Sequence, residues 1–370
     1  MNRIVLIGNG FDLAHGLKTR YEDFINWYWD QRLHNIVLIH DAVSTDALCS
    51  MKILPNSGFE NWYLFSYNNS FFKDLFKNEW NISGREFIEE LESKPDCFDI
   101  KYTPFLKNIC KNIKTKGWVD IENEYYSLLE RRIAKINNYT EKDIQYLNLQ
   151  LDVLRYKLIE YLKQEQMKGV DIIDTIKEKI YRPIKLQEIS VASKNILDKS
   201  TLGDLNPITT MLLNFNYTQT PEQYITNQSN VKLIYIHGKI NEPKSVIFGY
   251  GDELEDNYKK LQNLNENECL RHIKSIHYME SDNYRKVLEF IEADTFQVVI
   301  MGHSCGNSDR TLLNTLFEHK NCVSIKPYFY VKEDGTDNYL DIIQNISRNF
   351  TDMKLMRDRV VNKTYCEPLI

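Results

Sequence analysis

The sequence has little of what marks several protein classes. Of its 370 residues only 14 are glycine and 9 are proline, and no repeat or low-complexity tract occurs. Because 42% of the residues are hydrophobic and 26% are charged, wholesale disorder is excluded. No stretch approaches the ~20 apolar residues that a membrane span needs. The four apolar residues before Gly8 are too few for a signal peptide. We expect a soluble, cytoplasmic protein without a membrane partner.

The seven cysteines are scattered and form no C-x-x-C pair. A zinc ribbon and a thioredoxin-type redox site therefore have no support, and we expect reduced thiols and no zinc. The 46 basic and 52 acidic residues give a net charge of −6. That balance argues against a protein that coats nucleic acid, so nucleic acid is the less expected partner.

Short apolar runs at both ends of the chain predict an α/β fold. The run 3–7 stops at Gly8, as a buried parallel strand does, and the runs 211–215, 232–236, 297–301 and 323–331 also predict strands. A helix is expected over 21–39 and another over 309–319. Between about 58 and 199 the apolar residues recur at helical spacing. We predict a mostly parallel sheet formed by residues 1–50 and 200–370, with residues 51–199 as a large helical insertion.

Unusual residues follow four of the predicted strands, where ligands bind in open α/β sheets. They are the loop Gly8-Asn9-Gly10-Phe11-Asp12 with Gly16 and Thr19, then Asn216, then His237, then Gly302-His303-Ser304 with Asp309. Glycines directly after a strand let backbone N–H groups approach a phosphate, although a structural tight loop has the same composition. An Asn at a strand end also caps helices, and a lone His is often structural.

Residues 302–306 match G-x-S-x-G, the nucleophile elbow of α/β hydrolases. The only histidine after Ser304 is His319, 15 residues on in the same predicted helix. At 1.5 Å per residue it lies about 22 Å away, too far to take the serine proton. A serine hydrolase is therefore disfavoured.

Together these blocks, with Trp118-Val119-Asp120-Ile121-Glu122 and Phe215-Asn216-Tyr217-Thr218, resemble the AbiH family of bacterial phage abortive-infection proteins. The resemblance runs from residue 1 to about 315. It implies a defence protein that a phage-derived trigger activates.

The same blocks are similar, more distantly, to the sirtuin-like fold, a Rossmann-like arrangement. This similarity implies that NAD is bound, with Gly8, Gly10 and Gly16 at its phosphates and with Asn216 and His237 acting at the ribose beside nicotinamide. The other residues that we expect to contact the nucleotide are Asn9, Phe11, Thr19, His303, Ser304 and Asp309. Two departures stand out: Asp12 replaces the loop Ser, and Thr218 replaces the Asp of N-Y-D.

The mechanism that follows is hydrolysis of the nicotinamide N-glycosidic bond. His237 serves as general base, Asn216 positions the ribose or the attacking water, and Asp12 is a second base or ribose-hydroxyl acceptor.

Two other classes stay open. One is a metal-dependent nuclease or phosphohydrolase toxin, with the metal held by residues drawn from Asp12, His15, His237, His303 and Asp309. The other is a non-catalytic nucleotide sensor whose helical part recruits a partner or forms a homo-oligomer.

Overall fold

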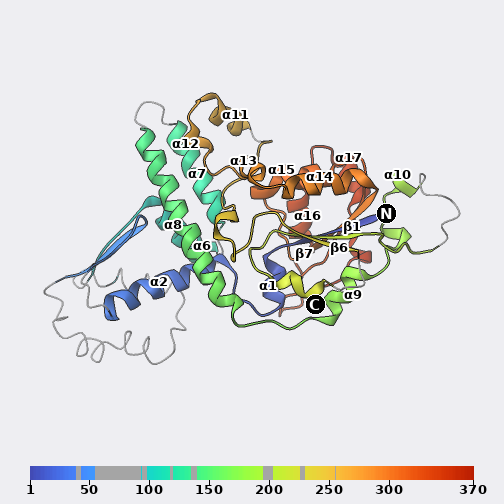
Figure 1. Ribbon diagram of the computed structural model, residues 1–370, viewed down its shortest axis with the longest axis horizontal. Helices are drawn as coiled ribbons and strands as arrows, with labels where there is room; N and C mark the ends of the chain where they lie inside the picture. Colours follow the sequence, from blue (N-terminus) through green and yellow to red (C-terminus); the bar gives the residue numbers. More distant parts are fainter. Residues whose placement is uncertain are drawn as a thin grey trace. The chain divides into compact units, whose positions relative to one another are not determined.

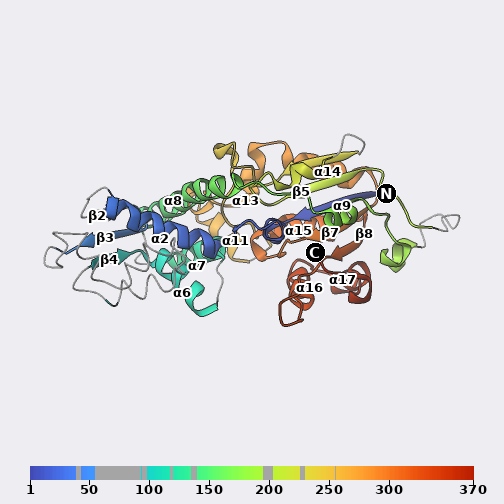
Figure 2. The ribbon, with the colours of Figure 1, turned by 90° about the horizontal axis from the view of Figure 1, so that it is seen from below.

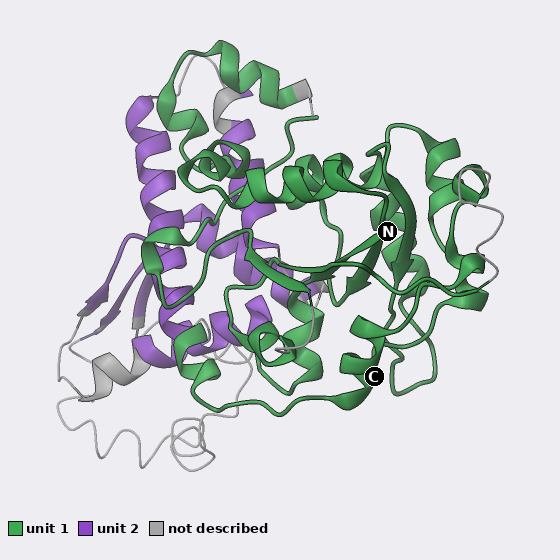
Figure 3. Cartoon of the chain, turned by 45° about the vertical axis from the view of Figure 1, so that its right-hand side comes forward, with its two compact units in different colours: residues 1–19, 162–370 green, residues 20–161 purple. Residues whose placement is uncertain are grey.

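The chain folds into two compact units, one inserted into the other. The computed structural model describes residues 1–38, 43–54, 93, 98–116, 120–134, 140–194, 203–225, 230–254 and 256–370. The first unit is Met1–Thr19 with Leu162–Ile370, and the second is Arg20–Tyr161 (Figure 3). The inserted unit is thus bounded by residues 20 and 161, whereas the sequence analysis placed the insertion at 51–199. The expected boundary at 199–200 lies outside the described residues.

The first unit is built on a five-stranded sheet in the order β6-β5-β1-β7-β8, and every neighbouring pair is parallel. Its strands are β1 (Asn2–Ile7), β5 (Thr210–Asn214), β6 (Val231–Tyr235), β7 (Phe296–Met301) and β8 (Cys322–Pro327). The predicted α/β class and mostly parallel sheet are confirmed. β1 lies at the centre of this order, and every one of its residues is buried, as expected for a strand covered on both faces.

Register brings four strand ends into one row. Ile7 of β1 pairs with Asn214 of β5 and with Met301 of β7, and Asn214 pairs with Tyr235 of β6. The loops that follow these four strands therefore leave the sheet at one edge. The strands that follow β1 in the chain, β5 and β6, are added on one side of it, and the next two, β7 and β8, are added on the other side. The direction in which strands are added therefore reverses between β1 and β7.

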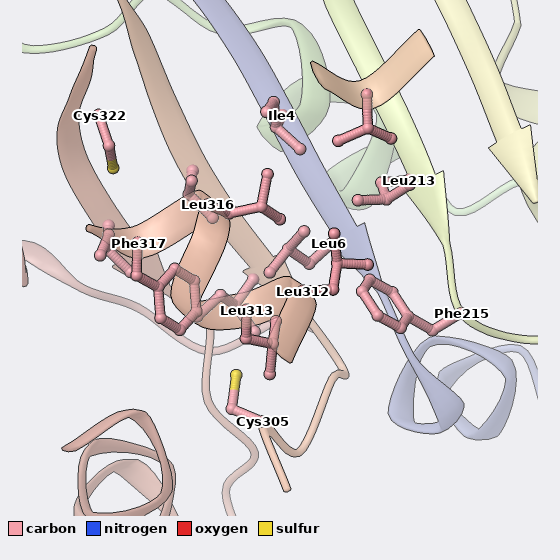
Figure 4. Packing of buried hydrophobic residues seen from close by; sticks show 14 of the residues in the cluster. Ile4, Leu6, Leu213, Phe215, Cys305, Leu312, Leu313, Leu316, Phe317 and Cys322 are labelled. Carbon is pink, nitrogen blue, oxygen red and sulfur yellow. The ribbon is translucent and has the colours of Figure 1, made fainter. Parts of the chain in front are cut away.

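Helices cover both faces of the sheet. Alternate residues of β1 point to opposite sides, Ile4 and Leu6 into one cluster and Val5 and Ile7 into another. Helix α15 covers the first face with Leu312, Leu313, Leu316 and Phe317, which recur at helical spacing (Figure 4). Helix α9 covers the second face with Ile176 and Ile180. Figure 1 shows α14 and α15 on one side of the strands and α1 and α9 on the other.

The helices of the first unit are α1 (Asn9–Ala14), α9 (Asp174–Tyr181), α10 (Val191–Lys194), α11 (Asp256–Asn263), α12 (Asn267–Leu270), α13 (Lys274–His277), α14 (Asn283–Ala293), α15 (Arg310–Phe317), α16 (Tyr339–Arg348) and α17 (Met353–Arg359). Short 3-10 helices lie at Leu186–Glu188, Thr220–Tyr224, Pro243–Ser245, Tyr278–Glu280 (η5), Asn307–Asp309 and Lys363–Tyr365. In the part of the chain that the structure describes, no helix combines the length and apolarity needed to cross a membrane.

The second unit combines helices with a small sheet. Its helices are α2 (Tyr21–Leu38), α6 (Pro104–Lys116), α7 (Ile121–Ala134) and α8 (Glu141–Gln166), the last continuing into the first unit. Figure 2 shows the antiparallel sheet β2-β3-β4 beside α2, with strands Val43–Thr45, Cys49–Ile53 and Phe98–Tyr102. Tyr28 and Trp29 of α2 are each 1% exposed and Phe24 is fully buried, so these three aromatic residues of that helix are core.

Two expectations need correction. The insertion was described as helical, but β4 lies within residues 51–199, and it pairs with β3, which begins before residue 51; these short strands carry too little apolar alternation to be recognised. The last strand was expected to extend to residue 331 but ends at Pro327. Proline has no N–H to donate to a sheet ladder, and the chain beyond it forms only isolated bridges.

Candidate functional site

The loops after β1 and β7 pack backbone to backbone. The N–H of Gly10 donates to the carbonyl of Gly302 at 2.8 Å, and the N–H of Gly8 donates to the last carbonyl of β7 at 3.2 Å. A Cβ on Gly302, where φ is +74°, would lie 2.1 Å from the nitrogen of Phe11, and one on Gly8 would lie 2.4 Å from the Cα of His303. The glycines at these positions are therefore required by the close approach of the two loops.

This packing uses most of the amides that were expected to hold a phosphate. Gly8 and Gly10 donate to the β7 loop, and Phe11 donates to the carbonyl of Gly8 at 2.9 Å. Asn9 is exposed, and its side chain accepts a hydrogen bond from the hydroxyl of Thr19. Asn9 and Thr19 are thus polar side chains of this region that do not take part in the packing of the two loops, while Gly16 (φ +81°) lies in the turn that follows α1.

Three polar side chains converge on the carboxylate of Asp309, and a fourth, Tyr278, contacts one of the three. Lys274 Nζ lies 2.9 Å and His237 Nε2 lies 3.2 Å from the same oxygen, Oδ1. His303 Nε2 lies 3.5 Å from the other oxygen, Oδ2. The hydroxyl of Tyr278 lies 3.2 Å from His237 Nε2. All of these residues are buried, so their charges interact in a medium of low polarity.

The electrostatics of this cluster set the protonation of each group. Burial opposes ionisation of Asp309, but Lys274 and the imidazole of His237 outweigh it and hold the pKa of Asp309 well below its usual value. Burial lowers the pKa of His237 below 6.5, and Lys274 lowers it further against the opposing effect of Asp309. At neutral pH the site therefore holds an ammonium, a carboxylate and a neutral His237.

Hydrogen bonds also select the tautomers of the two imidazoles. The N–H of Cys305 donates to His303 Nδ1 at 3.0 Å, so neutral His303 carries its proton on Nε2, facing Asp309. His237 likewise carries its proton on Nε2, because that nitrogen faces the Asp309 carboxylate. Its other nitrogen, Nδ1, has no hydrogen-bond partner among the residues that the structure describes. His237 can therefore accept a proton at Nδ1.

Aromatic rings hold the imidazoles in place. Phe215 packs at 4.2 Å from the His303 ring and at 5.3 Å from the His237 ring, measured between centroids. The ring of Tyr278 lies parallel to that of His237 at 6.2 Å. Phe215 follows β5 directly, so the row of strand ends supplies both the imidazoles and the ring between them.

A second polar group surrounds Asp12, which is 1% exposed. The Thr218 hydroxyl donates to Asp12 Oδ2 at 2.6 Å, and Asn216 Nδ2 donates to the carbonyl of Gly8 at 2.9 Å. Burial raises the pKa of Asp12 to about 6, although Thr218, Thr220 and Asn216 each favour its charged form. Asp12 Oδ1 is buried without a partner among the described residues. Asp12 thus titrates within the range in which acid–base catalysts operate.

The structure divides the predicted site residues into these two groups. His237, His303 and Asp309 come together, whereas Asp12 and Asn216 lie beside the first loop, and no hydrogen bond or ion pair of the described residues joins Asp12 to His237. Ser304 is exposed, and its carbonyl accepts from Asn345. In the segment 118–122, which contributed to the resemblance to the AbiH family, Trp118 and Val119 lie outside the described residues. Glu122 lies in the second unit, on α7.

Lys274 and Tyr278 were missed by the sequence analysis. They come from α13 and η5, in the long connection between β6 and α14, and neither follows a strand or a glycine loop. No local signal marks them, because only the folding of that connection over the strand ends brings them to Asp309.

The geometry bears on two alternative readings. In the G-x-S-x-G segment the non-glycine residue with positive φ is Cys305 (+55°), not Ser304, and the Cys305 side chain is buried in the apolar core (Figure 4). His319 contacts Glu292 instead of Ser304. For a metal, no group of three or more His, Cys, Asp or Glu in the described part of the chain is placed to hold one. Lys274 already supplies the cation at Asp309.

Comparison with known proteins identifies the family. No curated protein matches the chain in sequence. The sequence model described as "Bacteriophage abortive infection AbiH" matches residues 4–330, which include β5 to β8, all of β1 but its first two residues, and both polar groups. The chain therefore belongs to the AbiH family, whose described role is abortive infection in response to bacteriophage.

Proposed function

We propose that this AbiH protein acts in abortive infection by hydrolysing the bond between nicotinamide and ribose in NAD, with His237 as general base. One observation carries the proposal: Asp309 binds Nε2 of a buried, neutral His237 and leaves Nδ1 as the proton acceptor. A positioned imidazole of this kind activates water or a ribose hydroxyl.

The reaction needs little acid assistance. Nicotinamide is cationic in NAD and leaves neutral, taking the electron pair of the broken C–N bond. As a water oxygen bonds to the ribose carbon, His237 Nδ1 takes the water proton, and ADP-ribose is the second product. The imidazolium formed lies against the carboxylate of Asp309, which stabilises its charge.

The fold supports a nucleotide at this edge. We assign the sheet a Rossmann-like, sirtuin-like arrangement, since its order reverses between β1 and β7, where such sheets bind ligands. Asn9 and Thr19 would contact the phosphates, and Ser304 and His303 would contact a phosphate or ribose. Asn216, whose amide is anchored on Gly8, would position the ribose.

Asp12 and Thr218 also fit this proposal. They are the two departures from the sirtuin-like pattern, which has a hydroxyl residue at position 12 and an acid at position 218. In this structure they hydrogen-bond to each other at 2.6 Å. An acid and a hydroxyl thus stand side by side here, and in this proposal Asp12 is the second base or ribose-hydroxyl acceptor.

The test is nicotinamide release from NAD by the purified protein, followed by chromatography with and without EDTA. We expect release that EDTA does not change, that falls at least about 100-fold in His237→Ala and Asn216→Ala, and that stays at the wild-type level in His277→Ala. The control is apt because His277 is also an acid-paired histidine, with Glu280, but lies among exposed residues.

Each other outcome has a defined meaning. Full activity in both His237→Ala and Asn216→Ala would contradict the proposed roles. If the wild type releases no nicotinamide, NAD binding is measured by calorimetry. Binding without turnover would indicate a sensor or an enzyme that awaits its phage-derived trigger, and absence of binding would refute NAD as the ligand.

A further inference from the structure

Lys274 is a buried lysine that nothing in the sequence singles out. Its side chain is 1% exposed, and its Nζ lies 2.9 Å from Asp309 Oδ1. Burying an ammonium is costly unless a partner compensates, so such a residue is retained for a reason other than solubility.

The backbone around Lys274 is held firmly. Its N–H donates to the carbonyl of Tyr250 at 2.9 Å, and the N–H of Tyr250 donates to the carbonyl of His272 at 3.0 Å. A Cβ on Gly249 would lie 2.0 Å from that His272 carbonyl, and one on Gly251 would lie 3.2 Å from the Cβ of Lys274. The two glycines therefore allow the segment that carries Lys274 to lie directly against 249–251.

Lys274 and His237 share one carboxylate oxygen. With Lys274 present, the charge of Asp309 is already balanced by an ammonium, and His237 need only donate a neutral N–H to it. Without Lys274, the buried carboxylate would have no cation, and it would draw a proton onto the nearest base, which is His237. Protonated His237 could not serve as a base.

We propose that Lys274 is a positioning residue of the site: by balancing the charge of Asp309 it keeps His237 neutral, with its proton on Nε2 and with Nδ1 as the acceptor. The catalytic consequence rests on the function proposed above, whereas the protonation state of His237 does not. The groups that face His237 are Asp309, Lys274, His303, Tyr278, Tyr217 and the ring of Phe215. Of these, Lys274 is the lysine whose ammonium contacts the oxygen of Asp309 that also faces His237 Nε2.

The experiment is an NMR titration of the histidine ring signals in the full-length protein. With 8 histidines the spectrum is tractable, and the His237 signal is the one lost in His237→Asn. In Lys274→Met we expect His237 to titrate about one pH unit or more higher than in the wild type, since a charge within a few ångströms shifts a pKa by that amount. Lys274→Arg, which keeps the cation, should titrate like the wild type.

Two control variants separate charge from general disruption. Tyr278→Phe removes the other group at His237 Nε2 without changing charge, so it should move the titration much less than Lys274→Met. Lys286→Met removes an exposed lysine paired with Asp282 and should leave the titration of His237 unchanged. If the titration midpoint of His237 in Lys274→Met lies within about 0.3 pH units of the wild-type midpoint, the proposal is wrong.

A folding failure would not end the test. If Lys274→Met loses its far-UV circular dichroism, Lys274→Gln, which keeps a hydrogen-bond donor without charge, carries the same prediction. Asp309→Asn carries the opposite prediction. Lys274 remains while the carboxylate is gone, so His237 should titrate at a lower pH than in the wild type. An unchanged or higher value there would also overturn the proposal.

The activity readout comes last. If the NAD reaction is observed, the acidic limb of the kcat/KM profile of Lys274→Met should move to higher pH by the same amount as the NMR titration, and activity should recover at alkaline pH. An NMR shift in a protein that neither binds nor cleaves NAD would leave the role of Lys274 standing and refute the proposed function.

Discussion

The buried carboxyl of Asp12 makes the stability of the first unit depend on pH. Its pKa is about 6 in the folded chain, against an ordinary value of 3.8, because burial disfavours the charge. The folded state thus binds the proton more tightly than the unfolded state. The stabilisation this provides is fully present below pH 3.8 and is lost as the pH rises through 6.

The magnitude follows from the two pKa values. Each unit of difference corresponds to about 1.36 kcal/mol, so the whole effect is about 3 kcal/mol, of which about half is lost between pH 5 and pH 8. Asp12→Asn cannot ionise and lacks this dependence. The free energy of unfolding of the wild type minus that of Asp12→Asn should therefore fall by about 1.4 kcal/mol between pH 5 and pH 8.

The assay must report on the correct unit. All five tryptophans lie within residues 20–161, so tryptophan fluorescence would follow the second unit. Labelling of the Cys322 thiol, which is 1% exposed in β8, follows the unfolding of the first unit in urea. Asp341→Asn, at an exposed position of α16, is the control and should run parallel to the wild type. Parallel curves for the wild type and Asp12→Asn would refute the reasoning from burial.

Two further predictions concern stability. Gly302→Ala should cost more than about 2 kcal/mol, since it adds a collision with the β1 loop at 2.1 Å to the cost of a left-handed backbone. Gly335 also has positive φ, but a Cβ there would meet no atom, so Gly335→Ala measures the cost of the left-handed backbone alone. Equal urea midpoints for Gly302→Ala and Gly335→Ala would show that the collision at Gly302 is relieved. Glu188→Gln leaves the buried ammonium of Lys326 without its carboxylate and should cost about 3–5 kcal/mol. The exposed-pair control Asp282→Asn should cost less than about 1 kcal/mol, and a similar loss in both variants would contradict this account.

Much of the parallel sheet was predictable from the sequence. Its strands are continuous apolar runs because both faces are covered by helices, and that signal is local. The meeting of polar residues at the strand ends was predictable for a related reason: parallel strands end at one edge, so residues that follow different strands lie close together there. His237, His303 and Asp309 are in contact in this way. The β2-β3-β4 sheet was not predictable, because three short strands of mixed polarity carry no pattern that distinguishes them from loops.

Local sequence patterns thus predicted the α/β class and the edge of the sheet that carries the polar residues, and the combined motifs predicted the family. Which contacts those polar residues make was visible only in the folded chain. The tertiary structure directed the amides of Gly8 and Gly10 to the neighbouring loop, separated Asp12 from His237, and brought Lys274 to Asp309 across 35 positions of the chain. The reason is physical: a strand or a glycine turn is written in adjacent residues, whereas the charge that sets the protonation of a buried histidine comes from whichever distant segment packs against it.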